Sequence, residues 1–197
     1  MLSKWSLREV MVMSALAVVF AVVYLLFLQV GNVLFGVMGP MGYEVIFGIW
    51  FIVSIIAMYI IRKPGAAVIS ETMAATIEVL IGNAIGPSLI LSGLIQGLGA
   101  EAAFALTRYR SFSTLTLIMS GVGAAVFSFA WGFYVSGFAQ LNPWLLGSMF
   151  AVRCLSGALL AGLLGKWLTE KLADTGALNS FPIAKERKNR GGGSHAA

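Results

Sequence analysis

Six long hydrophobic runs determine the solvent in which this chain can fold. They cover residues 10–30, 43–61, 65–81, 88–107, 112–138 and 143–164 of the 197. Each is close to the roughly 20 apolar residues that a helix needs to span a bilayer. Only 11% of the residues are charged, against about a quarter in soluble domains, so they could not cover a water-facing surface. We therefore predict an all-α integral membrane protein, a bundle of six transmembrane helices within residues 1–178.

The positive residues predict how the bundle sits in the membrane. Twelve of the thirteen Lys and Arg residues lie before the first run, after the sixth, or in the breaks that follow the second and fourth. Cytoplasmic loops carry the excess of Lys and Arg, so we expect both termini in the cytoplasm of a multi-pass, bacterial-type plasma-membrane protein. The net charge of +5 is then explained by topology at the lipid bilayer rather than by nucleic acid. We expect the polar tail, residues 179–197, to be disordered or an engineered addition.

Motifs for nucleotide hydrolysis, catalysis and metal binding do not occur in the runs. The sequence has no G-x-x-x-x-G-K-[ST] phosphate loop, and its one histidine, His195, lies in the polar tail. It also lacks the G-x-S-x-G motif of hydrolases and the paired-histidine zinc motif. The chain is therefore expected not to be an enzyme and to carry no cofactor or metal.

Four glutamates and one arginine lie within or at the edges of the runs: Glu44, Glu71, Glu78, Glu101 and Arg153. A charge at the membrane centre costs at least about 2.5–3.5 kcal/mol, so each needs a partner, a hydrated cavity or a bound ion. Glu71 and Glu101 are the deeper pair, and we expect them to hold Arg153 or to cap backbone groups between helices. Glu44 and Glu78 lie near the outer ends of their helices, where no loop carries a cation, and we expect them to bind a ligand.

Several aromatic side chains lie at a depth similar to that of Glu44 and Glu78. Tyr43 and Trp50 share one face of the second run, and Trp131 and Tyr134 share a face of the fifth. Both tryptophans lie roughly 10 Å below the outer surface, deeper than the interfacial belt where Trp usually sits. Core packing or lipid contact is the simpler role for such a stripe. Aromatic faces attract cations by about 0.5–2 kcal/mol, however, so their place beside two unpaired carboxylates predicts the walls of a cation site.

Two amides complete the predicted site. Gln96 lies near mid-membrane in the fourth run, and Asn83 lies in the short loop after Glu78. An amide offers both a donor and an acceptor for the edge of a heterocycle, although an interhelical hydrogen bond is the alternative role for Gln96. We therefore predict a site for a small cationic or heterocyclic solute, formed by Tyr43, Glu44, Trp50, Glu78, Asn83, Gln96, Trp131 and Tyr134.

Several short segments resemble a known family. They are Ala17-x-x-x-Ala21, Tyr43-Glu44 with Gly48-Ile49-Trp50-Phe51, Arg62-Lys63-Pro64-Gly65-Ala66-Ala67, Gln96-Gly97-Leu98-Gly99-Ala100-Glu101, and Ser156-Gly157-Ala158-Leu159-Leu160-Ala161-Gly162. With the six-run size, the chain resembles the substrate-binding (S) subunits of energy-coupling-factor (ECF) vitamin importers. More narrowly, it is similar to their thiamine/hydroxymethylpyrimidine group, and the likeness extends over nearly all six runs.

The resemblance implies a function and partners. An S subunit of this group would capture thiamine or its hydroxymethylpyrimidine precursor from outside with high affinity, for ATP-driven uptake as part of an ABC importer. A membrane coupling subunit and two cytoplasmic ATPase subunits would supply the energy. In the family the small-residue face of the first helix docks on the coupling subunit, a role that the resemblance gives to Ala17 and Ala21.

Other functions stay open on the residues alone. The same scaffold could bind another vitamin. An autonomous small channel or proton-coupled carrier would use the buried glutamates, and it would transport without partners. An assembly or scaffold protein would bind no small molecule.

Overall fold

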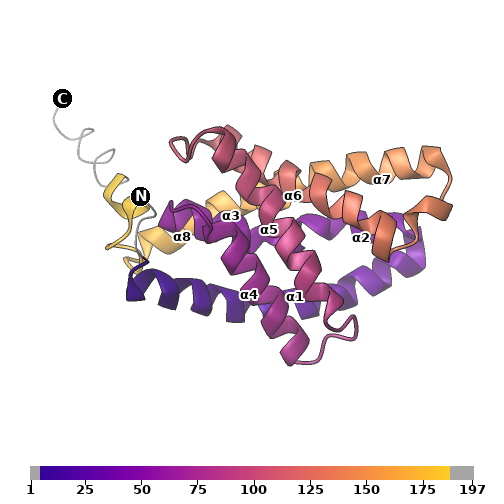
Figure 1. Cartoon of the computed structure of the whole chain (residues 1–197), viewed down its shortest axis with the longest axis horizontal. Helices are drawn as coiled ribbons and strands as arrows, with labels where there is room; N and C mark the ends of the chain where they lie inside the picture. Colours follow the sequence, from indigo (N-terminus) through magenta and orange to yellow (C-terminus); the bar gives the residue numbers. More distant parts are fainter. Residues whose placement is uncertain (1–4, 187–197) are drawn as a thin grey trace.

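The computed structural model describes residues 5–186, and over that range the chain forms helices and turns without a strand. The elements are α1 (Leu7–Met38), α2 (Met41–Ile46), η1 (Phe47–Phe51), α3 (Ile52–Ile61), α4 (Ala66–Leu80), α5 (Ser88–Leu106), α6 (Thr114–Val135), η2 (Phe138–Gln140), α7 (Pro143–Ser156), η3 (Gly157–Leu164) and α8 (Gly165–Asp174). The segments η1 and η2 are 3₁₀-helical, and η3 is π-helical. These elements form six rods, because α2, η1 and α3 run on as one and α7, η3 and α8 as another (Figure 1).

Five of the rods are long and apolar enough to cross a membrane. The sixth, α4, has 15 residues. At about 1.5 Å per residue it is roughly 22 Å long, shorter than a bilayer core of about 30 Å. The structure is therefore an all-α membrane fold as expected, and the count of six spans stays a prediction.

The first helix is longer than its hydrophobic run indicated. The run was expected to end at residue 30, but α1 continues to Met38 and ends where Gly39 adopts a φ of 62°. Gly31 lies inside the helix at a point where the ring of Tyr43 packs against the backbone. A Cβ atom there would lie 2.5 Å from Cε1 of Tyr43, so only glycine fits. This glycine permits close packing and does not end the helix.

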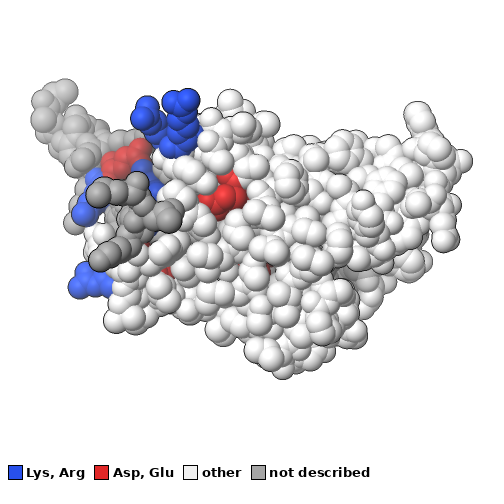
Figure 2. Space-filling view, in the orientation of Figure 1, with Lys and Arg blue, Asp and Glu red and all other residues white. Residues whose placement is uncertain are grey.

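The two ends of the bundle differ in charge. Helix α1 begins and α8 ends at the same end, where the visible Lys and Arg side chains also gather (Figures 1 and 2). We call this the basic end. We call the part of the bundle with the turns at 39–40, 81–87 and 136–142, which all contribute residues to one cavity, the far end. The charge distribution supports cytoplasmic termini, and this orientation stays a prediction.

Residues 175–186 fold back onto the basic end. Leu178, Phe181 and Ile183 are buried in the main core, and Nη2 of Arg62 lies 2.7 Å from Oε2 of Glu186. The expectation of a disordered tail from residue 179 is therefore wrong for residues 179–186, because their apolar side chains complete the core. The rest of the expected tail, residues 187–197, lies outside the described residues.

Ala17 and Ala21 lie inside the bundle. Both are fully buried, on a helix that packs mainly on α4. Small residues four apart let two helices approach closely, and here they serve contacts within the chain. The expectation that they form an outward docking face is wrong for this structure.

Candidate ligand-binding site

A cavity of about 630 Å³ lies among α1, α2, α4, α5, α6 and α7 at the far end of the bundle. Pockets for small molecules usually have about 300–1,000 Å³. Seven of the eight residues expected to bind a ligand line it: Tyr43, Glu44, Trp50, Glu78, Asn83, Gln96 and Trp131. The structure thus brings together side chains from four of the expected runs and one loop.

Glu78 and Asn83 form the polar edge of the cavity nearest the 81–87 turn. Nδ2 of Asn83 donates a hydrogen bond to Oε1 of Glu78 at 2.7 Å. Oδ1 of Asn83 accepts one from the backbone N–H of Ile85 at 2.8 Å. Both polar side chains are buried, at 2% and 7% exposure. Asn83 therefore fixes the carboxyl group of Glu78 and the shape of the turn together.

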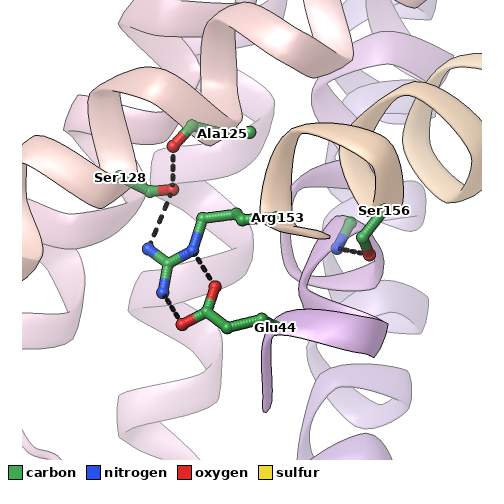
Figure 3. Close-up of polar contacts among 6 residues, drawn as sticks. Glu44, Ala125, Ser128, Arg153 and Ser156 are labelled. Carbon is green, nitrogen blue, oxygen red and sulfur yellow. Dashed lines mark hydrogen bonds and ion pairs between the residues drawn. The ribbon is translucent and has the colours of Figure 1, made fainter. Parts of the chain in front are cut away.

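Glu44 and Arg153 form an ion pair in the cavity wall (Figure 3). Two hydrogen bonds run from the guanidinium to the carboxylate, from Nε to Oε2 and from Nη2 to Oε1. Nη1 also reaches Oγ of Ser128 on α6 at 3.5 Å, and the guanidinium lies 3.6 Å from the centroid of the Phe47 ring. The charge of Glu44 is therefore already matched within the chain.

This pairing corrects the expected partners of Arg153. We expected Glu71 and Glu101 to hold it, but they stand on α4 and α5, whereas α7 packs on α2 and α6. Arg153 therefore meets Glu44, and the expectation that Glu44 lacks a cation is wrong.

Glu101 has the other role foreseen for it. Its Oε1 accepts a hydrogen bond from the backbone N–H of Gly65 at 2.7 Å, and its Oε2 accepts one from Ala67 at 3.0 Å. The first N–H groups of a helix have no partner within the helix, so this carboxylate caps α4 from the neighbouring α5. Glu101 does not line the cavity.

Two indoles and a phenol form aromatic walls of the cavity. The rings of Tyr43 and Trp50 have centroids 6.1 Å apart, and the hydroxyl of Tyr43 donates to Oδ1 of Asn32 at 2.5 Å. Nε1 of Trp131 donates to Oγ of Ser92 on α5 at 2.9 Å. The hydrogen bonds orient the rings of Tyr43 and Trp131, and ring contacts with Tyr43 and Phe47 position Trp50.

Tyr134 lies outside the cavity, which corrects its expected role as a wall. It is 83% exposed, and its ring lies 5.9 Å from that of Trp131. Two side chains that are three positions apart on a helix point in directions about 60° apart. This difference is enough to direct Trp131 into the cavity and Tyr134 out of the bundle.

Sequence reasoning missed other residues of the cavity, among them Ser92, Tyr24 and Glu71. Ser92 lies one helical turn before Gln96, a spacing that could have indicated it. Tyr24 lines the cavity from α1 and gave no such signal. Glu71, expected to have a structural role with Arg153, also lines the cavity and is 1% exposed.

Comparisons with known proteins agree over most of the chain. Residues 8–127 match the family described as "ABC-type cobalt transport system, permease component". The "Putative HMP/thiamine permease protein YkoE" of Bacillus subtilis (strain 168) is 51% identical over 189 residues, which cover 96% of this chain and 95% of that protein. A solved structure described as "Crystal structure of an S-component of ECF transporter" matches with a TM-score of 0.94 and 50% identity, over 98% of this chain and 100% of the other. The similarity therefore includes every helix that lines the cavity.

Proposed function

Because this chain belongs to the S components of energy-coupling-factor (ECF) transporters, we propose that its cavity binds thiamine or the hydroxymethylpyrimidine precursor of thiamine. The protein is a multi-pass plasma-membrane protein and the substrate-binding subunit of an importer. The relative's printed name concerns HMP and thiamine, and the chemistry of this cavity supports the same ligands here.

The carboxyl group of Glu78 is the observation that carries the proposal. It lines the cavity with an amide as hydrogen-bond partner, and no cation of residues 5–186 forms an ion pair with it. Arg153 is engaged by Glu44, so it does not neutralise Glu78. A buried carboxylate without a cation favours a positively charged ligand, and thiamine carries a thiazolium cation.

The other cavity residues suit the same ligand. Trp50, Trp131 and Tyr43 offer ring faces for a cation, each worth about 0.5–2 kcal/mol. Gln96 offers a donor and an acceptor for the edge of an aminopyrimidine, and Asn83 holds the carboxyl group of Glu78 in place. Glu44 contributes through its ion pair, as part of a wall without net charge.

The proposal extends to orientation and partners. With the termini in the cytoplasm, the far end and its cavity face the outside, where the vitamin is captured. We propose that a membrane coupling subunit and two cytoplasmic ATPase subunits drive the uptake step, and that this chain binds the ligand without catalysing a reaction. Ala17 and Ala21 are buried in the bundle, so they offer no docking surface to a coupling subunit in this structure.

A ligand titration tests the proposed function. The purified protein in detergent is titrated with thiamine, hydroxymethylpyrimidine, riboflavin and biotin, and tryptophan fluorescence is followed. We expect quenching by thiamine or the pyrimidine, because Trp50 and Trp131 line the cavity. A response to riboflavin or biotin, with none to the first two, would overturn the choice of ligand.

Transport in liposomes separates an S component from an autonomous carrier. The purified chain alone is expected to bind the vitamin but not to accumulate it, with or without a proton gradient. Accumulation driven by protons, without ATPase partners, would contradict the proposed division of labour.

A further inference from the structure

Glu71 is a buried acid that the proposed function does not use. It lies on α4, two helical turns from Glu78, so the two carboxyl groups line the cavity at levels about 10 Å apart along the helix. Glu78 lies near the 81–87 turn, and Glu71 lies toward the basic end. Glu71 therefore marks the deep end of the cavity.

One oxygen of Glu71 has no partner. Its Oε2 atom makes no hydrogen bond in the part of the chain that the structure describes. The hydroxyl groups of Ser54 and Tyr24 lie beside the carboxyl group. The Ser54 hydroxyl donates to the carbonyl oxygen of Phe51. The backbone N–H of Ser54 and the phenol of Tyr24 remain beside the carboxyl group, and neither reaches Oε2. A buried acceptor without a donor costs about 1–3 kcal/mol, so a donor is expected when the site is filled.

The packing of α5 puts an amide at the same level. A Cβ atom at Gly97 would lie 3.3 Å from the Cβ atom of Glu71, so these positions face each other across the contact between α4 and α5. Gln96 is the adjacent residue and lines the cavity. The indole N–H of Trp131 donates a hydrogen bond to Ser92, which lies one helical turn nearer to the far end than Gln96. The cavity therefore has a deep level with a carboxyl group and an amide, and an outer level with a carboxyl group and an indole.

We infer that Glu71 is a second acidic binding group, whose carboxyl group accepts a hydrogen bond from an N–H of an aminopyrimidine ring at the deep end of the cavity. This inference rests on the proposed function and assigns the two rings of thiamine to the two levels. The aminopyrimidine lies deep, with Gln96 and Glu71, and the thiazolium cation lies near Glu78. The single ring of hydroxymethylpyrimidine occupies the deep level alone.

Two carboxyl-to-amide substitutions and two ligands test this assignment. The dissociation constants of thiamine and hydroxymethylpyrimidine are measured for the full-length protein and for Glu71→Gln and Glu78→Gln, directly or by competition. Glu71→Gln is expected to weaken the binding of both ligands by roughly 10- to 100-fold, because the amide oxygen is a neutral acceptor in place of a charged one and the NH2 group opposes the N–H donors of the ring. Glu78→Gln is expected to weaken the binding of thiamine by more than about tenfold and to leave the dissociation constant of hydroxymethylpyrimidine nearly unchanged.

Glu101→Gln is the matched control, because it makes the same change in a buried carboxyl group that does not line the cavity. It should leave both dissociation constants unchanged, and thermal unfolding shows whether each variant is folded. Unchanged affinities in folded Glu71→Gln would overturn the inference and leave the proposed function standing. Weakening of thiamine alone in that variant would overturn the deep placement of the pyrimidine. Failure of the unaltered protein to bind either ligand would overturn the proposed function, and this inference with it.

Discussion

Arg153 on α7 holds the carboxylate of Glu44 on α2 with two hydrogen bonds, although the two residues lie 109 positions apart in the chain. Both are nearly inaccessible to solvent. The pair ties two rods of the bundle together at the cavity, and the ring of Phe47 covers the guanidinium. The wall of the site therefore depends on a contact that crosses most of the sequence.

Removing one partner of this pair is expected to destabilise the fold. Glu44→Gln leaves the guanidinium of Arg153 buried without a counter-charge, a change that usually costs about 3–5 kcal/mol. Chemical or thermal unfolding in detergent measures the loss. Glu170→Gln is the control, since its ion pair with Lys166 is partly exposed and such pairs contribute about 0–1 kcal/mol. Equal stability of Glu44→Gln and the unaltered protein would contradict a structural role for the pair.

Asn83 is expected to control affinity through Glu78. Asn83→Ala removes the donor to Oε1 of Glu78 and the acceptor for the N–H of Ile85, so both the carboxyl group and the turn lose their fixed positions. We expect thiamine binding to weaken by about tenfold, or about 1.4 kcal/mol, in a fluorescence titration. Asn142→Ala is the control, because that amide caps α7 from another turn of the far end. A similar loss of affinity in both variants would show a general effect of the far-end turns.

The sequence predicted the fold better than the contacts within it. Hydrophobic runs and turn residues indicated the helices, because spans of a bilayer must be long and apolar. They misplaced the end of α1, since a glycine that permits close packing looks the same in sequence as one that ends a helix. Gly31 belongs to the first kind and Gly39 to the second.

The candidate site was predicted in composition but not in pairing. The depth of a residue in the membrane follows from its position along its own helix, which the local sequence gives. Residues predicted at similar depths did meet, and seven of the expected residues line one cavity. The partner of Arg153 depends on which helices are neighbours, which a single sequence does not give. The same limit applies to Tyr134, whose direction is set by the rotation of α6 against α5 and α7.

Glu101 is expected to act on stability and not on binding. Glu101→Ala leaves the N–H groups of Gly65 and Ala67 without their acceptor, and loss of a capping group costs about 0.5–2 kcal/mol. The midpoint of thermal unfolding in detergent should fall, while the dissociation constant of thiamine stays the same because Glu101 does not line the cavity. A changed dissociation constant at unchanged stability would mean that this carboxylate acts on the site.

Ala17 is expected to be intolerant of a large side chain, for a reason other than docking. It is fully buried, whereas its neighbour Val18 is 50% exposed. Ala17→Trp forces an indole into the packed bundle, and overpacking usually costs about 1–3 kcal/mol or more, so we expect a lower yield of folded protein and a lower unfolding temperature.

Val18→Trp tests the same change one residue away, on an exposed position, and it should fold and bind thiamine normally. Size-exclusion profiles, unfolding temperatures and thiamine titrations of both variants distinguish packing from docking. If Ala17→Trp folds, binds thiamine normally and loses energised uptake in the complete transporter, the alanine meets the proposed coupling subunit during transport. The burial seen here would then describe one state of a helix that moves.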